Sequence, residues 1–141
     1  MIIKQIVLSV FLLFFIVNSS IAQKANDIVG KYHLPNDLDI EIYKKGEKYF
    51  GVIIALNGYQ DGQTIDYKNP DDSKQNTPLL GMVIIRGLVF NEDSKEWVNG
   101  SMYGPEKGMV FNLKITEIRE SEIEVVGSKY FFWHTLTWLK L

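Results

Sequence analysis

The sequence predicts an all-β fold, a single eight-stranded antiparallel up-and-down barrel, from two kinds of pattern. Apolar and polar residues alternate in several stretches, such as Leu38 to Ile42 and Phe111 to Ile115, which is typical of strands with one buried face. Two more stretches, residues 49–56 and 82–90, are apolar at nearly every position. Their β-branched residues and internal glycines favour strands covered on both faces over helices.

Turn-forming residues separate eight segments with strand character. Most connections are short, so neighbouring strands should pair antiparallel, and eight such strands can close without leaving edges. A flattened sandwich is the main alternative. The expected strands are residues 28–33, 38–44, 48–56, 82–90, 95–103, 109–118, 121–127 and 130–140.

The pair Asn99-Gly100 would suit a two-residue hairpin turn, but a turn there leaves very short strands on both sides. We therefore interpret Gly100 as a bulge or close-packing glycine within a strand.

The first 22 residues have the layout of a cleaved secretory signal peptide. Lys4 precedes an apolar run of 12 residues from Ile6 to Val17, and small residues at Ser20 and Ala22 suit cleavage after Ala22. The run is shorter than the ~20 residues of a membrane-spanning helix, although an uncleaved anchor is the alternative. We expect an exported protein, periplasmic or secreted, without a stable membrane span after cleavage.

Residues 23–141 have the length of one domain, which we expect to be the barrel. Lys4 is the only charged residue before Gln23, so its removal changes the formal net charge from −2 to −3. A slightly acidic chain lacks the basic footprint of nucleic-acid binding. The chain has no cysteine, which excludes disulfides and leaves stability to packing.

The longest connection, after the third strand, is acidic. Asn69 is a favourable helix N-cap, Pro70 suits the first helical position and Asp71 and Asp72 suit the first turn, so we expect a short helical turn over residues 70–76. The alternatives are oxygen ligands for a hard cation, or a carboxylate pair for acid-base chemistry. No metal-ligand spacing, catalytic triad or phosphate loop accompanies the segment, so we expect no metal, cofactor or catalytic residue.

Other polar residues offer weaker signals. Arg86 lies in an apolar strand, so it must be paired, reach the rim, or meet a bound anion. We expect structural roles for His33 and His134. The many aromatic residues, Trp97 and Tyr103 among them, are enough to fill the barrel, or they line an apolar pocket.

Ordered motifs run through nearly the whole of residues 23–141. They are Asp66-x-x-Asn69-Pro70-Asp71, Pro78-Leu79-x-Gly81, Gly87-Leu88, Trp97-x-x-Gly100, Tyr103-x-Pro105-x-x-Gly108-x-x-Phe111 and Trp138. Together they resemble the exported bacterial family known as domain of unknown function 2147. The resemblance implies a β-barrel related to the lipocalin-like calycins, with no established activity and no catalytic residues to transfer. Gly30-Lys31-Tyr32 is similar to the Gly-x-Trp that opens lipocalin barrels, with Tyr in place of Trp.

Three functions follow from these features. The first is a non-enzymatic barrel that binds a small apolar or amphipathic molecule, with residues 57–80 partly covering its mouth. The second is an envelope module with a filled barrel that binds protein or glycan through exposed aromatics near Trp97 and Tyr103. The third is a hydrolase that uses carboxylates among Asp66, Asp71, Asp72 and Glu106. The candidate ligand-binding residues are Arg86, Asp66, Asn69, Asp71, Trp97 and Tyr103.

Overall fold

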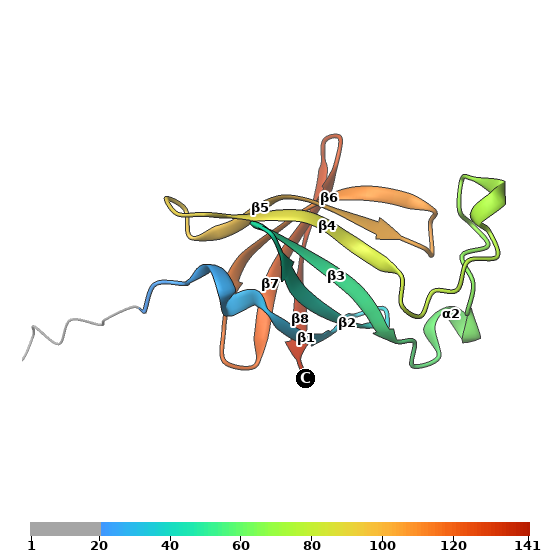
Figure 1. Ribbon diagram of the computed structural model, residues 1–141, viewed down its shortest axis with the longest axis horizontal. Helices are drawn as coiled ribbons and strands as arrows, with labels where there is room; N and C mark the ends of the chain where they lie inside the picture. Colours follow the sequence, from blue (N-terminus) through green and yellow to red (C-terminus); the bar gives the residue numbers. More distant parts are fainter. Residues whose placement is uncertain (1–20) are drawn as a thin grey trace, which may run out of the picture.

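Eight antiparallel strands pair in sequence order, and the last strand also pairs with the first, which closes a barrel (Figure 1). The computed structural model describes residues 21–141. The all-β barrel expected from the sequence is confirmed, and the flattened sandwich is excluded. The strands are β1 (Gly30–His33), β2 (Asp39–Lys45), β3 (Lys48–Ala55), β4 (Val83–Asn91), β5 (Glu96–Gly104), β6 (Met109–Ile118), β7 (Glu122–Lys129) and β8 (Phe132–Lys140).

The alternation in the sequence becomes an inward and an outward face. Ile40 and Ile42 of β2 and Ile123 and Val125 of β7 are buried, whereas the residues between them are partly exposed. The core is therefore built from every second residue of the strands. Trp97 and Trp138 are among its largest members and are almost completely buried.

Gly100 allows two strands and a core side chain to approach closely. The pairing of β5 with β6 shifts register between Trp97 and Gly100, so the expected bulge is present inside the strand. A Cβ on Gly100 would lie 2.5 Å from Leu88 Cδ2 and 3.1 Å from the carbonyl oxygen of Leu113. Only glycine fits this position without movement of the core.

The two ends of the barrel differ. We call the end with the β2–β3, β4–β5 and β6–β7 turns the closed end, because a 3-10 helix, η1 (Ala25–Ile28), packs there. The expected first strand, residues 28–33, is too long at its start, because β1 begins at Gly30 and Ile28 is the buried end of η1. The cause is local, because Asp27 accepts a hydrogen bond from the backbone N–H of Lys24 and the chain turns.

Aromatic side chains hold η1 in place by donating to its polar groups. Trp97 Nε1 donates to the carbonyl of Ala25 at 2.8 Å, and Tyr49 Oη donates to Asn26 Oδ1 at 2.7 Å. Tyr32 Oη donates to the carbonyl of Ile28 at 2.7 Å. Burial, with a smaller contribution from the Asp27 carboxylate, raises the pKa of Tyr32 to about 12. This hydroxyl therefore stays a donor at neutral pH.

The connection between β3 and β4 carries two short helical turns, α2 (Tyr59–Gly62) and the 3-10 helix η2 (Asp72–Lys74). The turn expected over residues 70–76 is present but shorter, and its N-cap is Asp71, which accepts from the N–H of Ser73. Asn69 was the expected cap. Its side-chain amide is instead engaged with Asp66, to which Nδ2 donates at 2.7 Å.

The predicted signal peptide, residues 1–22, lies outside the described residues except for Ile21 and Ala22. From residue 21 to residue 141, no helix has the length and hydrophobicity needed to cross a membrane.

Gly100→Ala should lower the free energy of unfolding by about 1–3 kcal/mol, because the new methyl group overpacks the core against Leu88 and a fixed carbonyl. Urea unfolding of the protein measures this difference. Gly127→Ala in β7 is the control, because its Cβ would meet nothing within 4 Å. Equal stabilities of the two variants would contradict the close packing at Gly100.

Candidate functional site

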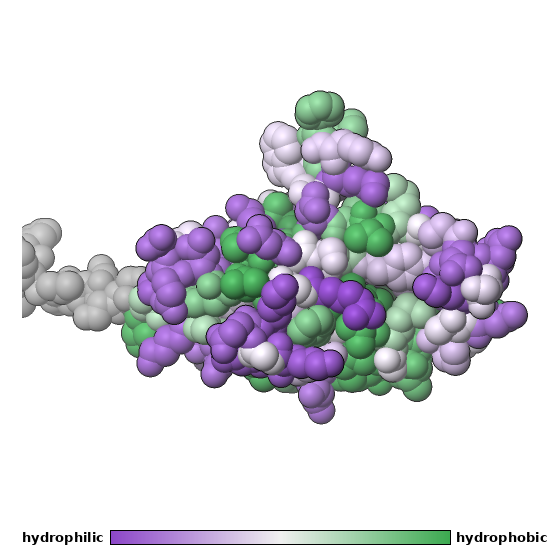
Figure 2. Space-filling model, turned by 45° about the horizontal axis from the view of Figure 1, so that its top comes forward, coloured by the Kyte–Doolittle hydropathy of each residue, from purple (hydrophilic) through white to green (hydrophobic). Residues whose placement is uncertain are grey.

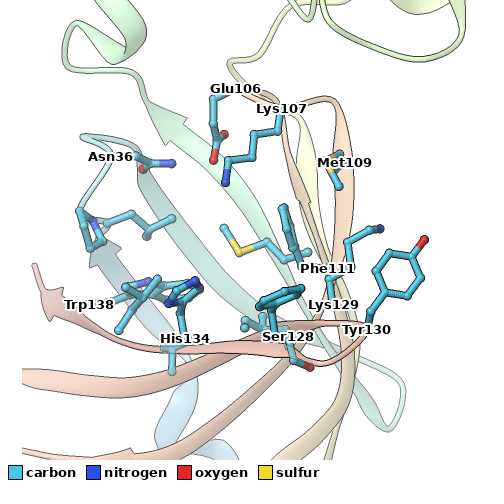
Figure 3. Close-up of a pocket in the computed structure, with 18 residues that line it drawn as sticks. Asn36, Glu106, Lys107, Met109, Phe111, Ser128, Lys129, Tyr130, His134 and Trp138 are labelled. Carbon is cyan, nitrogen blue, oxygen red and sulfur yellow. The ribbon is translucent and has the colours of Figure 1, made fainter.

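A cavity of about 480 Å³ lies at the end of the barrel opposite η1 (Figure 3). We call this end the mouth; the β1–β2, β3–β4, β5–β6 and β7–β8 connections lie there. Strands β5 to β8 and the β1–β2, β5–β6 and β7–β8 connections supply the lining. The volume falls in the range of small-molecule sites, about 300–1,000 Å³.

The inner part of the cavity is apolar. Leu113, Val125 and Trp138 are buried core residues, and each also forms part of the cavity wall. Phe111 and its cross-strand partner Met102 extend this wall toward the β5–β6 connection. An apolar group that entered here would contact the same side chains that form the barrel core.

The cavity exists because two neighbouring strands differ in length. β1 has four residues and β8 has nine, and they pair only at Tyr32 with Lys140 and His33 with Leu139. The mouth half of β8 therefore extends beyond β1. Leu136 is 45% exposed there although it lies in line with the buried Trp138.

The neighbouring strand β7 contributes free space at Gly127. A Cβ at this position would meet nothing within 4 Å. Val125, two residues earlier on the same face, fills its position with a side chain. The absence of a side chain at Gly127 leaves part of the cavity empty.

Polar groups gather at the rim. Glu106 and Lys107 point into the cavity from the β5–β6 connection, and Asn36 and His134 face it from other sides (Figure 3). Lys107 Nζ and Lys129 Nζ each lie 5.8 Å from the centre of the Phe111 ring. The cavity thus combines an apolar interior with hydrogen-bonding and charged groups at its entrance.

The β3–β4 connection fixes the rim residue Glu106. Tyr59 Oη donates to Glu106 Oε2 at 2.6 Å, and Lys68 Nζ donates to its carbonyl at 2.9 Å. Burial and the hydrogen bond to Glu106 raise the pKa of Tyr59 far above its usual range, so the hydroxyl remains a donor. Gly108 permits the β3–β4 connection to approach the β5–β6 connection, because a Cβ on Gly108 would lie 2.1 Å from the carbonyl oxygen of Lys68.

The predicted candidate residues gather elsewhere, on the outside of the barrel. Asp66, Asn69, Arg86 and Tyr103 line a shallower hollow of about 250 Å³ between the β3–β4 connection and the outer faces of β4 and β5. Tyr103 Oη donates to Asp66 Oδ1 at 2.8 Å, and Asn69 donates to Asp66 Oδ2. Burial and this bond raise the pKa of Tyr103 far above its usual range. The buried Asp66 thereby ties the connection to β5, which is a structural role.

Of these four residues, Arg86 is exposed on β4 and reaches solvent. The two other predicted residues, Asp71 and Trp97, lie outside the hollow. Asp71 is exposed and caps η2; hydrogen bonds from Ser73 hold the pKa of its carboxyl below the usual range. Trp97 is fully buried near η1. The expectation that exposed aromatic residues near Trp97 form a binding surface is therefore wrong.

Two further expectations need correction. The β3–β4 connection buries Tyr59 and Leu79, but no residue of 57–80 lines the cavity, so it does not form the expected lid. His134 is an exposed rim residue rather than a packed structural one. His33 does have a structural contact, because its Nδ1 lies 2.6 Å from Asp39 Oδ1.

The four carboxylates proposed for a hydrolase do not meet. Asp66 faces the outer hollow, and Glu106 faces the cavity. Asp71 caps η2, and Asp72 accepts from Gln75 Nε2 at 3.1 Å. These groups therefore cannot act together as an acid-base pair in one cleft.

None of the cavity residues was among the predicted ligand-binding residues, although Glu106 and His134 were considered for other roles. Phe111, Leu113 and Leu136 have the same alternation as residues of the filled core. The usable signals were Gly127 on the apolar face of an alternating strand and the uncharged aromatic run Tyr130 to Trp133.

The fold and the site together define a lipocalin-like barrel with a cavity at one end. Residues 30–140 match the bacterial family described as "Uncharacterized protein conserved in bacteria (DUF2147)", so the chain belongs to this family. Among solved structures, the barrel is similar to one described as "Protein HP1028 from the human pathogen Helicobacter pylori belongs to the lipocalin family". That match has a TM-score of 0.71 and 18% identity, and covers 82% of this chain and 83% of the other. No curated protein matches the chain.

Tyr103→Phe should lower the free energy of unfolding by about 1–3 kcal/mol, because the buried Asp66 loses one of its two side-chain donors. Urea unfolding measures the loss. Tyr67→Phe is the matched control on the same connection, because Tyr67 is 50% exposed. If both variants match the unsubstituted protein, the bond to Asp66 does not fasten the connection.

Proposed function

We propose that the barrel is a non-enzymatic binding protein that holds one small amphipathic molecule. Its apolar part lies against Phe111, Leu113 and Trp138, and its polar end meets the rim. The observation that carries the proposal is the cavity of about 480 Å³ with an apolar interior and a polar entrance. Burial of apolar surface supplies the affinity, at roughly 25 cal/mol per Å².

The rim determines how the molecule is oriented. Lys107 offers ammonium donors, Glu106 offers carboxylate acceptors, and Asn36 and His134 offer both kinds of group. A polar head group in the apolar interior would lose its hydrogen bonds to water without replacement. The head group therefore lies at the entrance and the apolar part lies inside.

We also propose that the protein works after export, with a mature chain that begins at Gln23. The packed domain supports this start. Gln23 Nε2 donates to the carbonyl of Lys95 at 2.7 Å, and Gln23 Oε1 accepts from the N–H of Ile118. A chain cut after Ala22 keeps these contacts.

Native mass spectrometry of the protein purified gently from its own host tests both proposals. We expect the mass of residues 23–141 plus one small molecule that organic solvent removes. A bare protein that also fails to bind the apolar dye N-phenyl-1-naphthylamine would contradict ligand binding. A mass that includes residues 1–22 would contradict cleavage.

Gly127→Phe should weaken dye binding by about tenfold or more, because the new ring occupies the cavity. The backbone at Gly127 is outside the left-handed region, so the substitution adds no backbone strain. Fluorescence titration with N-phenyl-1-naphthylamine measures the affinity.

Thr137→Phe is the matched control for this variant. Thr137 is exposed on β8 and is absent from the cavity lining, so the Thr137→Phe substitution adds the same ring outside the barrel. Equal affinities for the two variants would place the dye outside the cavity.

A further inference from the structure

The β7–β8 hairpin ends in four consecutive aromatic residues that are exposed to solvent. Tyr130 is 87% exposed, Phe131 90%, Phe132 75% and Trp133 70%. We call these four residues the aromatic tip. Soluble proteins rarely expose large contiguous apolar surface, and where they do it commonly marks a site of interaction.

The aromatic tip projects beyond the body of the barrel. The pairing of β6 with β7 ends at Asn112 with Ser128, whereas β7 and β8 continue to Lys129 with Phe132. At its end, the hairpin therefore consists of β7 and β8 without β6 beside them. It stands out from the barrel in Figures 1 and 2. Because the hairpin projects, the tip is convex. Neighbouring side chains of a strand point to opposite faces, so the tip is aromatic on both sides.

The segment of chain that carries the aromatic tip has charge of one sign, although Glu106 of the β5–β6 connection shares the cavity rim with Tyr130 and Phe132. Residues 125–141 contain no Asp or Glu, although the whole chain has 17 acidic residues. Lys129 stands at the base of the tip, and its Nζ donates to the carbonyl of Val110 at 2.8 Å. The exposed Lys107 lies beside the same strand end, near Phe111.

We propose that the aromatic tip inserts into the interfacial region of a lipid bilayer that contains anionic headgroups. Trp and Tyr are favoured at this depth, because the rings are apolar and carry one polar atom. Phe131 and Phe132 reach further toward the acyl chains, and Lys129 remains at the level of the phosphates. A narrow convex tip is surrounded completely by lipid, whereas a protein partner would need a matching groove.

This orientation turns the mouth toward the membrane. Tyr130 and Phe132 belong to both the aromatic tip and the cavity rim. A molecule that leaves the cavity beside them enters the headgroup region rather than bulk water. Membrane docking goes beyond the proposed ligand binding, and the two can be tested separately because docking does not require an occupied cavity.

The chain carries its own reporter for the test. Trp97 is 0% exposed, and Trp138, which is 1% exposed but lines the cavity, is replaced in a Trp138→Phe variant, so a change in tryptophan emission on membrane contact reports Trp133. Residues 23–141, emptied of ligand, are titrated with vesicles of phosphatidylcholine, with and without phosphatidylglycerol. We expect a blue shift with the anionic vesicles and quenching of the emission by brominated lipids.

Variants identify the residues responsible. Phe131→Ser combined with Phe132→Ser should weaken vesicle binding by about tenfold or more, because two apolar rings no longer enter the lipid. Val29→Ser is the control; Val29 is a 47% exposed apolar residue near the closed end. Lys129→Glu should remove the preference for anionic vesicles, whereas Lys45→Glu at the end of β2, near the closed end, should keep it.

Three results would overturn the proposal. One is an unchanged Trp133 emission with anionic vesicles. Another is vesicle binding that the Phe131 and Phe132 substitutions leave intact. The third is a blue shift that appears without vesicles as the protein concentration rises, because a second copy of the chain would then cover the aromatic tip.

Discussion

The site depends on one constraint, the difference in length between the two strands that close the barrel. β1 contributes four residues and β8 nine, so the closure consists of two residue pairs near the closed end. These pairs are enough to complete the barrel, but they leave the mouth half of β8 without β1 beside it. The cavity and its partly exposed lining follow from this difference.

The two ends of the barrel differ in what fills the space between the strands. At the closed end, η1 adds Ile28 to the core, and its polar groups accept hydrogen bonds from Trp97, Tyr49 and Tyr32. At the mouth, neither α2 nor η2 of the β3–β4 connection lines the cavity, and Gly127 supplies no side chain. One end is therefore filled and the other hollow, although the strands alternate in the same way along their whole length.

The acidic connection between β3 and β4 supports the mouth from outside. Asp66 binds Tyr103 of β5, and Tyr59 binds Glu106 on the β5–β6 connection. Gly108 lets the backbone of Lys68 approach this connection. The family motifs in this region thus have structural roles. They hold the β3–β4 and β5–β6 connections together and fix the position of the Glu106 carboxylate at the rim.

The sequence predicted the strands well because periodicity and turn residues act locally. The bulge at Gly100 and the helical turn near Asp72 were also predicted from local patterns. The cavity was not, because Leu113 at its wall and Ile115 in the filled core have the same alternation. What separates them is the presence or absence of a facing group, which depends on how far β1 extends beside β8.

The space between Phe111, Gly127 and Trp138 should receive an apolar group. Methionine methyl groups can report its entry, because Met102 and Met109 line the cavity and Met82 does not. In NMR spectra of residues 23–141 titrated with decanoate, we expect saturable shifts of the Met102 and Met109 methyl signals and an unchanged Met82 signal. Unchanged signals from Met102 and Met109 at saturating decanoate, or a shift of Met82 alone, would contradict this expectation.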